Sequence, residues 1–150
     1  MQSITPPEGF RHQYALQVRW GDMDALGHVN NARFLTYIEQ ARFDYFRAGL
    51  GRRYQVGDRP GFILVKVVLE FKQPLFESDD VHIFTRCIRL GGSSFDLEHW
   101  VMRLKDGQLE AAAQATITSV VYDYVERKSV PIPDALRAAI KAYEVAAPNE

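Results

Sequence analysis

The 150-residue sequence predicts an α+β fold, with one antiparallel sheet and one long helix. A single stretch of the chain, residues 32–48, carries apolar residues at helical spacing. One strand pattern precedes this stretch, and four strand patterns follow it with no helix between them. One strand, one long helix and four consecutive antiparallel strands together form the α+β pattern.

Composition places limits on the class of protein. The chain is long enough for one domain with a real core, and its 47% apolar and 25% charged residues are ordinary for a globular protein. A net charge of −1 gives no basic field that would attract nucleic acid or anionic lipid, so we expect neither partner. The single cysteine, Cys87, excludes an internal disulfide and favours a reducing compartment. Its place within a strand pattern indicates a small buried apolar residue rather than a nucleophile.

The N-terminal residues 1–12 contain two prolines and little pattern, which predicts a loose arm. They have neither the basic start nor the apolar core of a signal peptide. No run of the sequence reaches the ~20 apolar residues of a membrane span. We therefore expect a cytoplasmic protein that does not enter a membrane.

The spacing of apolar residues predicts the first strand and the long helix. Residues 14–20 alternate apolar and polar side chains, which predicts a half-buried strand. Residues 32–48 predict the helix, which the glycines after Ala48 end. Its apolar face has i, i+4, i+7, i+11 spacing and consists of Phe34, Ile38, Ala41 and Tyr45. Three further residues widen this face, namely Leu35, Tyr37 and Phe46.

The second half of the chain predicts four strands at residues 62–71, 81–89, 94–104 and 111–124. In the first of these strands, one apolar face is predicted to consist of Ile63, Val65, Val67, Leu69 and Phe71. Tight hairpins are predicted at Gly91-Gly92 and Asp106-Gly107. Residues 134–143 predict a short C-terminal amphipathic helix.

Polar residues are concentrated in the turn before the long helix, and these are Asp22, Asp24, His28, Asn30 and Asn31. Asn30 is a good N-cap, because its side-chain oxygen can accept from the free N–H groups of the first turn. Those N–H groups and the helix dipole can instead stabilise a ligand oxygen that carries negative charge. A carboxylate beside such a helix start suits hydrolysis of a polarised carbonyl, although Asp and Asn also occur in turns for local reasons alone.

The string Gly-Asp-Met-Asp-Ala-Leu-Gly-His-Val-Asn-Asn, at residues 21–31, is followed by Phe34, Tyr37, Glu39, Ala41 and Arg42. Together these residues resemble the 4-hydroxybenzoyl-CoA thioesterase branch of the hot-dog fold superfamily, over roughly residues 14–125. The resemblance implies a five-stranded antiparallel sheet wrapped around one long central helix, with the short C-terminal helix added. Residues 1–150 would then form a single hot-dog thioesterase domain.

The resemblance also implies the roles of individual residues. Asp24 matches the catalytic aspartate, acting as nucleophile or general base, and the backbone N–H of Asn31 matches the oxyanion donor. His28 and Asn30 would orient water, the carboxylate or the leaving thiol, while Asp22 would shape the turn. Substrate contacts are expected from Gly27 and, for the nucleotide of CoA, from Arg89, Ser93 and Ser94. Neither a metal nor an organic cofactor is expected, because CoA is part of the substrate.

The expected reaction is hydrolysis of an acyl-CoA thioester to a free carboxylic acid and CoA. An acyl-carrier-protein thioesterase and a non-catalytic acyl-thioester binding module of the same fold are alternatives, and a dehydratase is a weaker one. The four histidines show no zinc-site spacing, and no G-x-S-x-G motif for a nucleophilic serine is present. Family members pair their sheets edge to edge, so we expect a homodimer or a dimer of dimers, a homotetramer.

Overall fold

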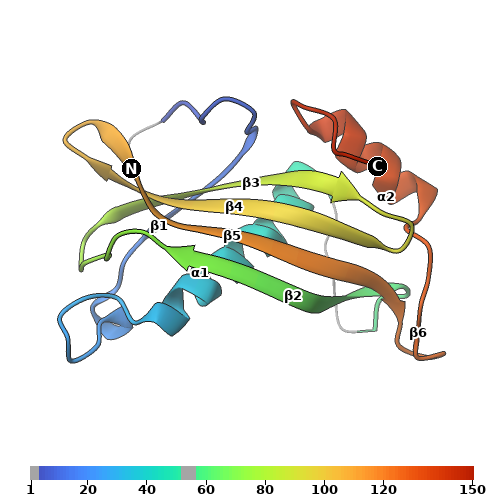
Figure 1. Cartoon of the computed structure of the whole chain (residues 1–150), viewed down its shortest axis with the longest axis horizontal. Helices are drawn as coiled ribbons and strands as arrows, with labels where there is room; N and C mark the ends of the chain where they lie inside the picture. The colour runs from blue at the N-terminus through green and yellow to red at the C-terminus, as the bar shows by residue number, and fades with distance from the viewer. Residues whose placement is uncertain (1–3, 52–56) are drawn as a thin grey trace.

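The computed structural model describes residues 4–51 and 57–150 of the chain. Figure 1 shows one curved sheet with the long helix across one of its faces. The elements in chain order are β1 (His12–Gln17), the 3₁₀ turn η1 (Trp20–Asp22), α1 (Asn31–Asp44), the π-helical turn η2 (Tyr45–Gly49), β2 (Gly61–Phe71), β3 (Asp80–Leu90), β4 (Ser94–Lys105), β5 (Gln108–Asp123), β6 (Lys128–Ser129) and α2 (Asp134–Tyr143). No helix among the described residues is long and apolar enough to cross a membrane.

The sheet has the strand order β1-β3-β4-β5-β2, and every pairing is antiparallel. This confirms the predicted α+β fold, with its five main strands, one long helix and short C-terminal helix. The two-residue strand β6 was not predicted; it pairs with the end of β5. Strands β1 and β2 form the two edges of the sheet.

The core lies between the concave face of the sheet and α1. The four predicted core residues of the helix are each at most 2% exposed, which confirms the apolar face. Small side chains of β5, namely Ala112, Ala113 and Ala115, are fully buried in the same cluster as three of these helix residues. Cys87 is buried as predicted, and burial raises the pKa of its thiol to about 12.

The first predicted strand, residues 14–20, is displaced in the structure. β1 begins at His12 and ends at Gln17, and Trp20 lies in η1 with 77% of its surface exposed. The chain leaves the sheet because η1 is closed locally, with the Arg19 N–H donating to Asp22 Oδ2 at 3.2 Å. The alternation of apolar residues therefore continues past the end of the strand.

The long helix is also shorter than its predicted span of residues 32–48. The α-helical hydrogen bonds end at Asp44, and the chain continues as the wider turn η2 to Gly49. Leu50 then donates its N–H to Tyr45 O at 3.2 Å. A π-helical turn continues the coil of the helix and its apolar residues, so the sequence pattern does not separate it from the α-helix before it.

Strand β2 does not present the single apolar face that the sequence predicts. Its register to β5 shifts between Leu64 and Lys66, and a bulge of this kind moves later side chains to the other face. Phe62 packs against the buried cluster that contains Phe46 and Phe95. Val67 and Leu69 instead pack against the cluster that contains Phe34 and Ile38. Val65 is left 55% exposed.

The N-terminal arm was predicted to be loose over residues 1–12. In the structure, the arm packs against the convex face of the sheet at Phe10. The Phe10 ring lies 6.1 Å from the Phe84 ring and 4.4 Å from the Arg86 guanidinium carbon. His12 is already part of β1 and is buried.

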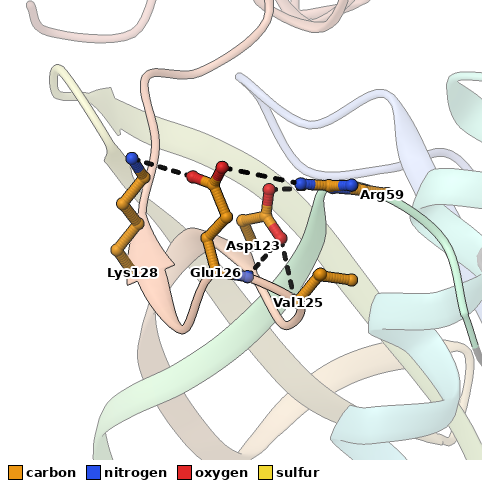
Figure 2. Close-up of polar contacts among 5 residues, drawn as sticks. All are labelled: Arg59, Asp123, Val125, Glu126 and Lys128. Atoms are coloured by element: carbon orange, nitrogen blue, oxygen red, sulfur yellow. Dashed lines mark hydrogen bonds and ion pairs between the residues drawn. The ribbon is translucent and has the colours of Figure 1, made fainter.

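The polar loop predicted before β2 falls partly on residues 52–56, which lie outside the described residues. Its last part is attached to the turn between β5 and β6 through Asp123 (Figure 2). One carboxylate oxygen of Asp123 accepts from Arg59 Nε at 2.9 Å. The other accepts from the backbone N–H groups of Val125 and Glu126, at 2.9 and 3.1 Å.

Candidate active site

The polar turn between β1 and α1 is closed by its own backbone. The Asp24 N–H donates to His28 O at 3.0 Å, and the Gly27 N–H donates back to Asp24 O at 3.1 Å. Gly27 has φ +86, a left-handed conformation that glycine adopts without steric cost. The Val29 N–H donates to Leu75 O at 2.8 Å, which attaches the turn to the loop before β3.

Asp24 points its carboxylate toward the helix start. Its Oδ1 accepts from the Leu26 N–H at 2.9 Å, and its Oδ2 lies 3.4 Å from the Asn30 side-chain nitrogen. The residue is partly exposed. A carboxylate held in this way is fixed in direction and still reachable by a substrate.

The helix start has the geometry that the sequence predicts for Asn30. The Asn30 Oδ1 accepts from the Ala32 N–H at 2.9 Å, with Asn30 in an extended conformation, so Asn30 is the N-cap. Asn31 is the first helical residue, and its N–H has no acceptor within the helix. No acceptor for this N–H occurs among the described residues either.

A small pocket of about 380 Å³ opens beside this helix start. It is lined by residues of the turn and of the first two helical turns, namely Gly21, Asp22, Met23, Asp24, Asn30, Ala32, Arg33 and Thr36. The pocket brings the Asp24 carboxylate and the positive end of the helix dipole to one surface. This arrangement is suited to a substrate whose carbonyl oxygen gains negative charge.

Asp22 has a different set of partners from Asp24. Its Oδ2 accepts from the Tyr37 hydroxyl at 2.5 Å, and its backbone oxygen accepts from the Asn30 N–H at 3.0 Å. Arg33 Nε lies 3.9 Å from its Oδ1. Asp22 therefore connects the turn, the N-cap and the second turn of the helix.

His28 lies beside the site and outside the small pocket. Its ring Nδ1 lies 3.3 Å from the Val29 backbone oxygen, and no contact found among the described residues joins the ring to Asp24 or Asn30. The structure thus brings Asp24, Asn30 and Asn31 together but leaves His28 beside them.

The predicted nucleotide-binding residues lie at the opposite end of the sheet (Figure 1). The Asp24 turn adjoins the Asp80 end of β3, because Gln17 pairs with Asp80. Arg89 lies nine residues further along β3, at roughly 30 Å for a strand rise of 3.3 Å per residue. Within one chain, Arg89, Ser93 and Ser94 are not brought together with Asp24.

Arg89 is also occupied by neighbours on its own sheet. Its guanidinium binds both carboxylate oxygens of Asp96, at 2.7 and 3.1 Å, and donates to Ser94 Oγ at 2.9 Å. The Ser93 backbone oxygen accepts from the Val121 N–H. The Arg89 guanidinium is therefore already paired with Asp96 and Ser94, and 37% of the Arg89 side chain is exposed.

A larger pocket of about 590 Å³ lies at the other end of α1. Its apolar lining comes from Phe43, Phe46, Phe62, Tyr124 and Val125, and the polar part includes Arg42 and Arg59. Twelve residues separate Asn31 from Phe43, which corresponds to about 18 Å along the helix axis. This pocket is therefore separate from the Asp24 turn of the same chain.

The part of the chain that the structure describes contains no cluster of side chains suited to bind a metal ion. Within residues 4–51 and 57–150, no three His, Cys, Asp or Glu side chains are arranged to hold a metal ion. Two of the histidines have partners in the core: His12 binds Asp44 at 2.8 Å, and His99 binds Thr85 at 2.9 Å.

Tyr37 is the residue of this site that sequence reasoning missed. Its helical position assigned it to the apolar face, where it is indeed 5% exposed. A buried tyrosine hydroxyl needs a polar partner, which is the one signal that the sequence contained. The partner, Asp22, is fifteen residues away, and only the fold brings the two together.

Residues 18–140 match the model of a family described as the thioesterase-like superfamily. The long-chain acyl-CoA thioesterase FadM of Escherichia coli is 28% identical over 129 residues, which cover 86% of this chain and 96% of FadM. The PA2801 protein of Pseudomonas aeruginosa is 35% identical with a TM-score of 0.77, covering 86% of this chain and 97% of that structure. A thioesterase of Thermus thermophilus, solved with coenzyme A and Zn, is 32% identical with a TM-score of 0.77, covering 91% of this chain and 96% of that structure.

Proposed function

Because the chain belongs to the thioesterase-like superfamily and has its hot-dog fold, we propose that it hydrolyses an acyl-CoA thioester to a carboxylic acid and CoA. The observation that carries the proposal is the placement of Asp24 beside a helix start whose Asn31 N–H is free. The long-chain acyl-CoA thioesterase FadM supports a CoA thioester as the substrate.

In the proposed reaction, the thioester carbonyl oxygen accepts a hydrogen bond from the Asn31 N–H. Negative charge that develops on this oxygen is stabilised by the N–H and the helix dipole, and one such donor is worth about 3–4 kcal/mol. The Asp24 carboxylate either attacks the carbonyl carbon, giving a mixed anhydride that water hydrolyses, or takes a proton from an attacking water. In both routes the CoA thiolate leaves and is protonated.

The other site residues have supporting roles in this proposal. The Asn30 amide beside Asp24 orients the carboxylate, and Gly27 allows the turn to close without a side chain at the surface. His28 orients water or the leaving thiol from beside the turn. The mechanism uses these protein groups alone, with no metal and no organic cofactor.

We also propose that the working form is a homo-oligomer, at least a dimer, that pairs through β2. This edge strand is eleven residues long and carries exposed apolar side chains, including Val65 at 55% and Val68 at 46%. An edge of this kind is suited to pairing with a second strand. The other edge, β1, has only six residues.

Two-fold pairing of β2 would bring the larger pocket to the active site of the partner. Antiparallel partners place the Phe62 end of one strand beside the Phe71 end of the other. Phe71 contacts Phe34, in the first turns of α1, at 5.2 Å between ring centroids. The pocket at Phe62 would then receive the acyl chain of a thioester bound at the other copy's Asp24. The CoA nucleotide would extend over the protein surface toward Arg89, Ser93 and Ser94 of a neighbouring subunit.

The test is release of free thiol from acyl-CoA substrates, with Asp24→Asn as the variant. Asparagine keeps an oxygen that accepts from the Leu26 N–H, so the turn is preserved while the charge is lost. We expect kcat to fall by at least about 10²-fold, with KM and Tm little changed.

Asp79→Asn is the matched control, because the Asp79 carboxylate also accepts a backbone N–H, from Phe76 at 2.8 Å. We expect this control to keep its turnover. Wild-type-like turnover in Asp24→Asn would refute the mechanism. Saturable acyl-CoA binding by the wild-type protein without thiol release would indicate a binding module instead.

A further inference from the structure

Tyr37 connects the second turn of α1 to the catalytic turn through a single hydrogen bond. Its hydroxyl donates to Asp22 Oδ2 at 2.5 Å. The tyrosine is 5% exposed, and the Asp22 side chain is 14% exposed, so water competes little for either group. Helical side chains lean toward the N-terminus, which lets a phenol two turns after Asn30 reach back to the turn.

Asp22 passes this restraint to both functional parts of the site. On one side, its carboxylate accepts from the Arg19 N–H at 3.2 Å, which holds η1 in place two residues before Asp24. On the other side, its backbone oxygen accepts from the N–H of the N-cap Asn30 at 3.0 Å. Asp22 therefore closes η1, binds the N-cap and, through Tyr37, is connected to the body of the helix.

We propose that Tyr37 is a positioning residue for the hydrolytic reaction: through Asp22 it fixes the Asp24 carboxylate relative to the Asn31 N–H. This inference rests on the function proposed above. Catalysis depends on this relative placement, because a misplacement of about 1 Å can cost about 10²-fold in rate. Without the phenol hydroxyl, the Asp22 side chain keeps the Arg19 N–H and one contact with α1, the 3.9 Å ion pair with the half-exposed Arg33 in its first turn.

Two observations indicate that the phenol acts through Asp22 and not on the substrate. Tyr37 does not line the small pocket that contains Asp24; it lines an adjoining pocket of about 750 Å³, which includes Asp22 but not Asp24. Burial and the hydrogen bond to the Asp22 carboxylate raise the pKa of Tyr37, so its hydroxyl stays protonated at every working pH. The hydroxyl is therefore a permanent donor, and its bond to a charged acceptor is of the stronger kind.

The chain offers a matched control at the other end of the same helical segment. The Tyr45 hydroxyl also donates to a carboxylate, Glu144 Oε1, at 2.5 Å, and Tyr45 is fully buried. Tyr37→Phe and Tyr45→Phe therefore each remove one hydrogen bond from a tyrosine hydroxyl to a carboxylate. The two variants differ in the other partners of that carboxylate. Glu144 accepts from the Cys87 N–H and has no contact with the turn.

The experiment compares kcat, KM and Tm of the two variants in the thiol-release assay. We expect Tyr37→Phe to lower kcat by about tenfold or more while KM stays within about twofold. Tyr45→Phe is expected to lower Tm by at least as much and to keep kcat within about twofold of wild type. A purely structural role of Tyr37 would move the two variants together.

A double-variant cycle tests whether the effect of Tyr37 passes through Asp22. Asp22→Ala alone and Asp22→Ala with Tyr37→Phe are measured beside Tyr37→Phe. If the phenol acts through Asp22, the double variant loses no more kcat than the worse single variant, because both changes remove one interaction. Multiplied losses in the double variant would overturn the inference.

Wild-type kcat in Tyr37→Phe would also overturn it, as would an equal loss in Tyr45→Phe. These results would leave the proposed function standing as long as wild type releases thiol and Asp24→Asn does not. A wild-type protein that releases no thiol from any acyl-CoA would instead refute the proposed function itself.

Discussion

His99 is a fully buried residue in the middle of β4, beneath the long helix. Its Nδ1 lies 2.9 Å from Thr85 Oγ1, and its Nε2 has no partner among the described residues. Burial, followed by the nearby Arg42 and His12, lowers the pKa of His99 to about 3. The folded protein therefore keeps this imidazole neutral.

This residue predicts a pH dependence of stability. An unfolded histidine takes up a proton near pH 6.5, whereas the folded one does so near pH 3. The stabilisation is therefore complete above about pH 6.5, and each unit below that pH costs up to about 1.4 kcal/mol. In the double variant His99→Leu with Thr85→Val, the free energy of unfolding should fall less steeply as the pH is lowered. The difference in slope corresponds to about one proton fewer taken up on unfolding.

Urea unfolding between pH 7.5 and pH 4.5 measures this slope. Thr85→Val alone is the control, because it keeps the imidazole and should keep the wild-type slope. An unchanged slope in the double variant would show that His99 does not titrate on unfolding.

The polar turn shows how far single residues could be predicted. The N-cap role of Asn30 follows from local chemistry, and the structure confirms it. The roles of Asp24 and His28 stay predictions. The bond between Tyr37 and Asp22 could not be predicted, because a helical period specifies which face is buried but not which polar group a buried hydroxyl meets.

At the scale of elements, regular patterns succeeded and local irregularities did not. The two hairpins at Gly91-Gly92 and Asp106-Gly107 and the C-terminal helix are where the sequence predicts them. The bulge in β2 and the turn η2 were missed, because each inserts residues without interrupting the apolar character of the segment. Edge strand β1 was displaced for the related reason that Trp20 is apolar yet exposed.

The β5–β6 turn gives a prediction at this scale. Asp123 accepts from two backbone N–H groups and from Arg59, whereas the Glu126 side chain makes only surface ion pairs (Figure 2). We therefore expect Asp123→Ala to lower Tm more than Glu126→Ala at pH 7.

The difference between these variants should depend on pH in a stated direction. The backbone N–H of Glu126, together with Arg59 and Val125, lowers the pKa of Asp123. Its contribution is therefore complete above the unfolded value of about 3.9 and is lost as the pH falls below it. Thermal unfolding at pH 7 and pH 3 measures the difference, and a gap that widens in acid would contradict this assignment.

At the scale of the whole molecule, the uncovered edge β2 predicts association. We expect at least a dimer at micromolar concentration by light scattering. Val68→Glu should raise the dissociation constant by at least about tenfold, because two-fold pairing places a charge from each copy among the exposed apolar side chains of the other copy's β2. Val145→Glu is the control, since Val145 is 64% exposed and lies outside β2. A wild-type monomer at this concentration would contradict the proposal.

The strand order has a consequence for the order of folding. The three central strands β3, β4 and β5 are joined by short hairpins, so their pairing closes small loops. Both edge strands instead pair with partners that are distant in sequence, since β1 pairs with β3 and β2 pairs with β5. Distant pairings carry a larger loop-closure entropy and slow folding.

The central hairpins are therefore expected to form a nucleus on which the two edges dock later. The Asp24 turn lies in the sequence between β1 and α1, outside that nucleus, and it is attached through Leu75 to the loop between β2 and β3. Elements that dock late and have few long-range contacts are also those that open most readily in the native state. The proposed catalytic turn thus lies in a segment that forms late and reopens first, while the central strands beneath it remain closed.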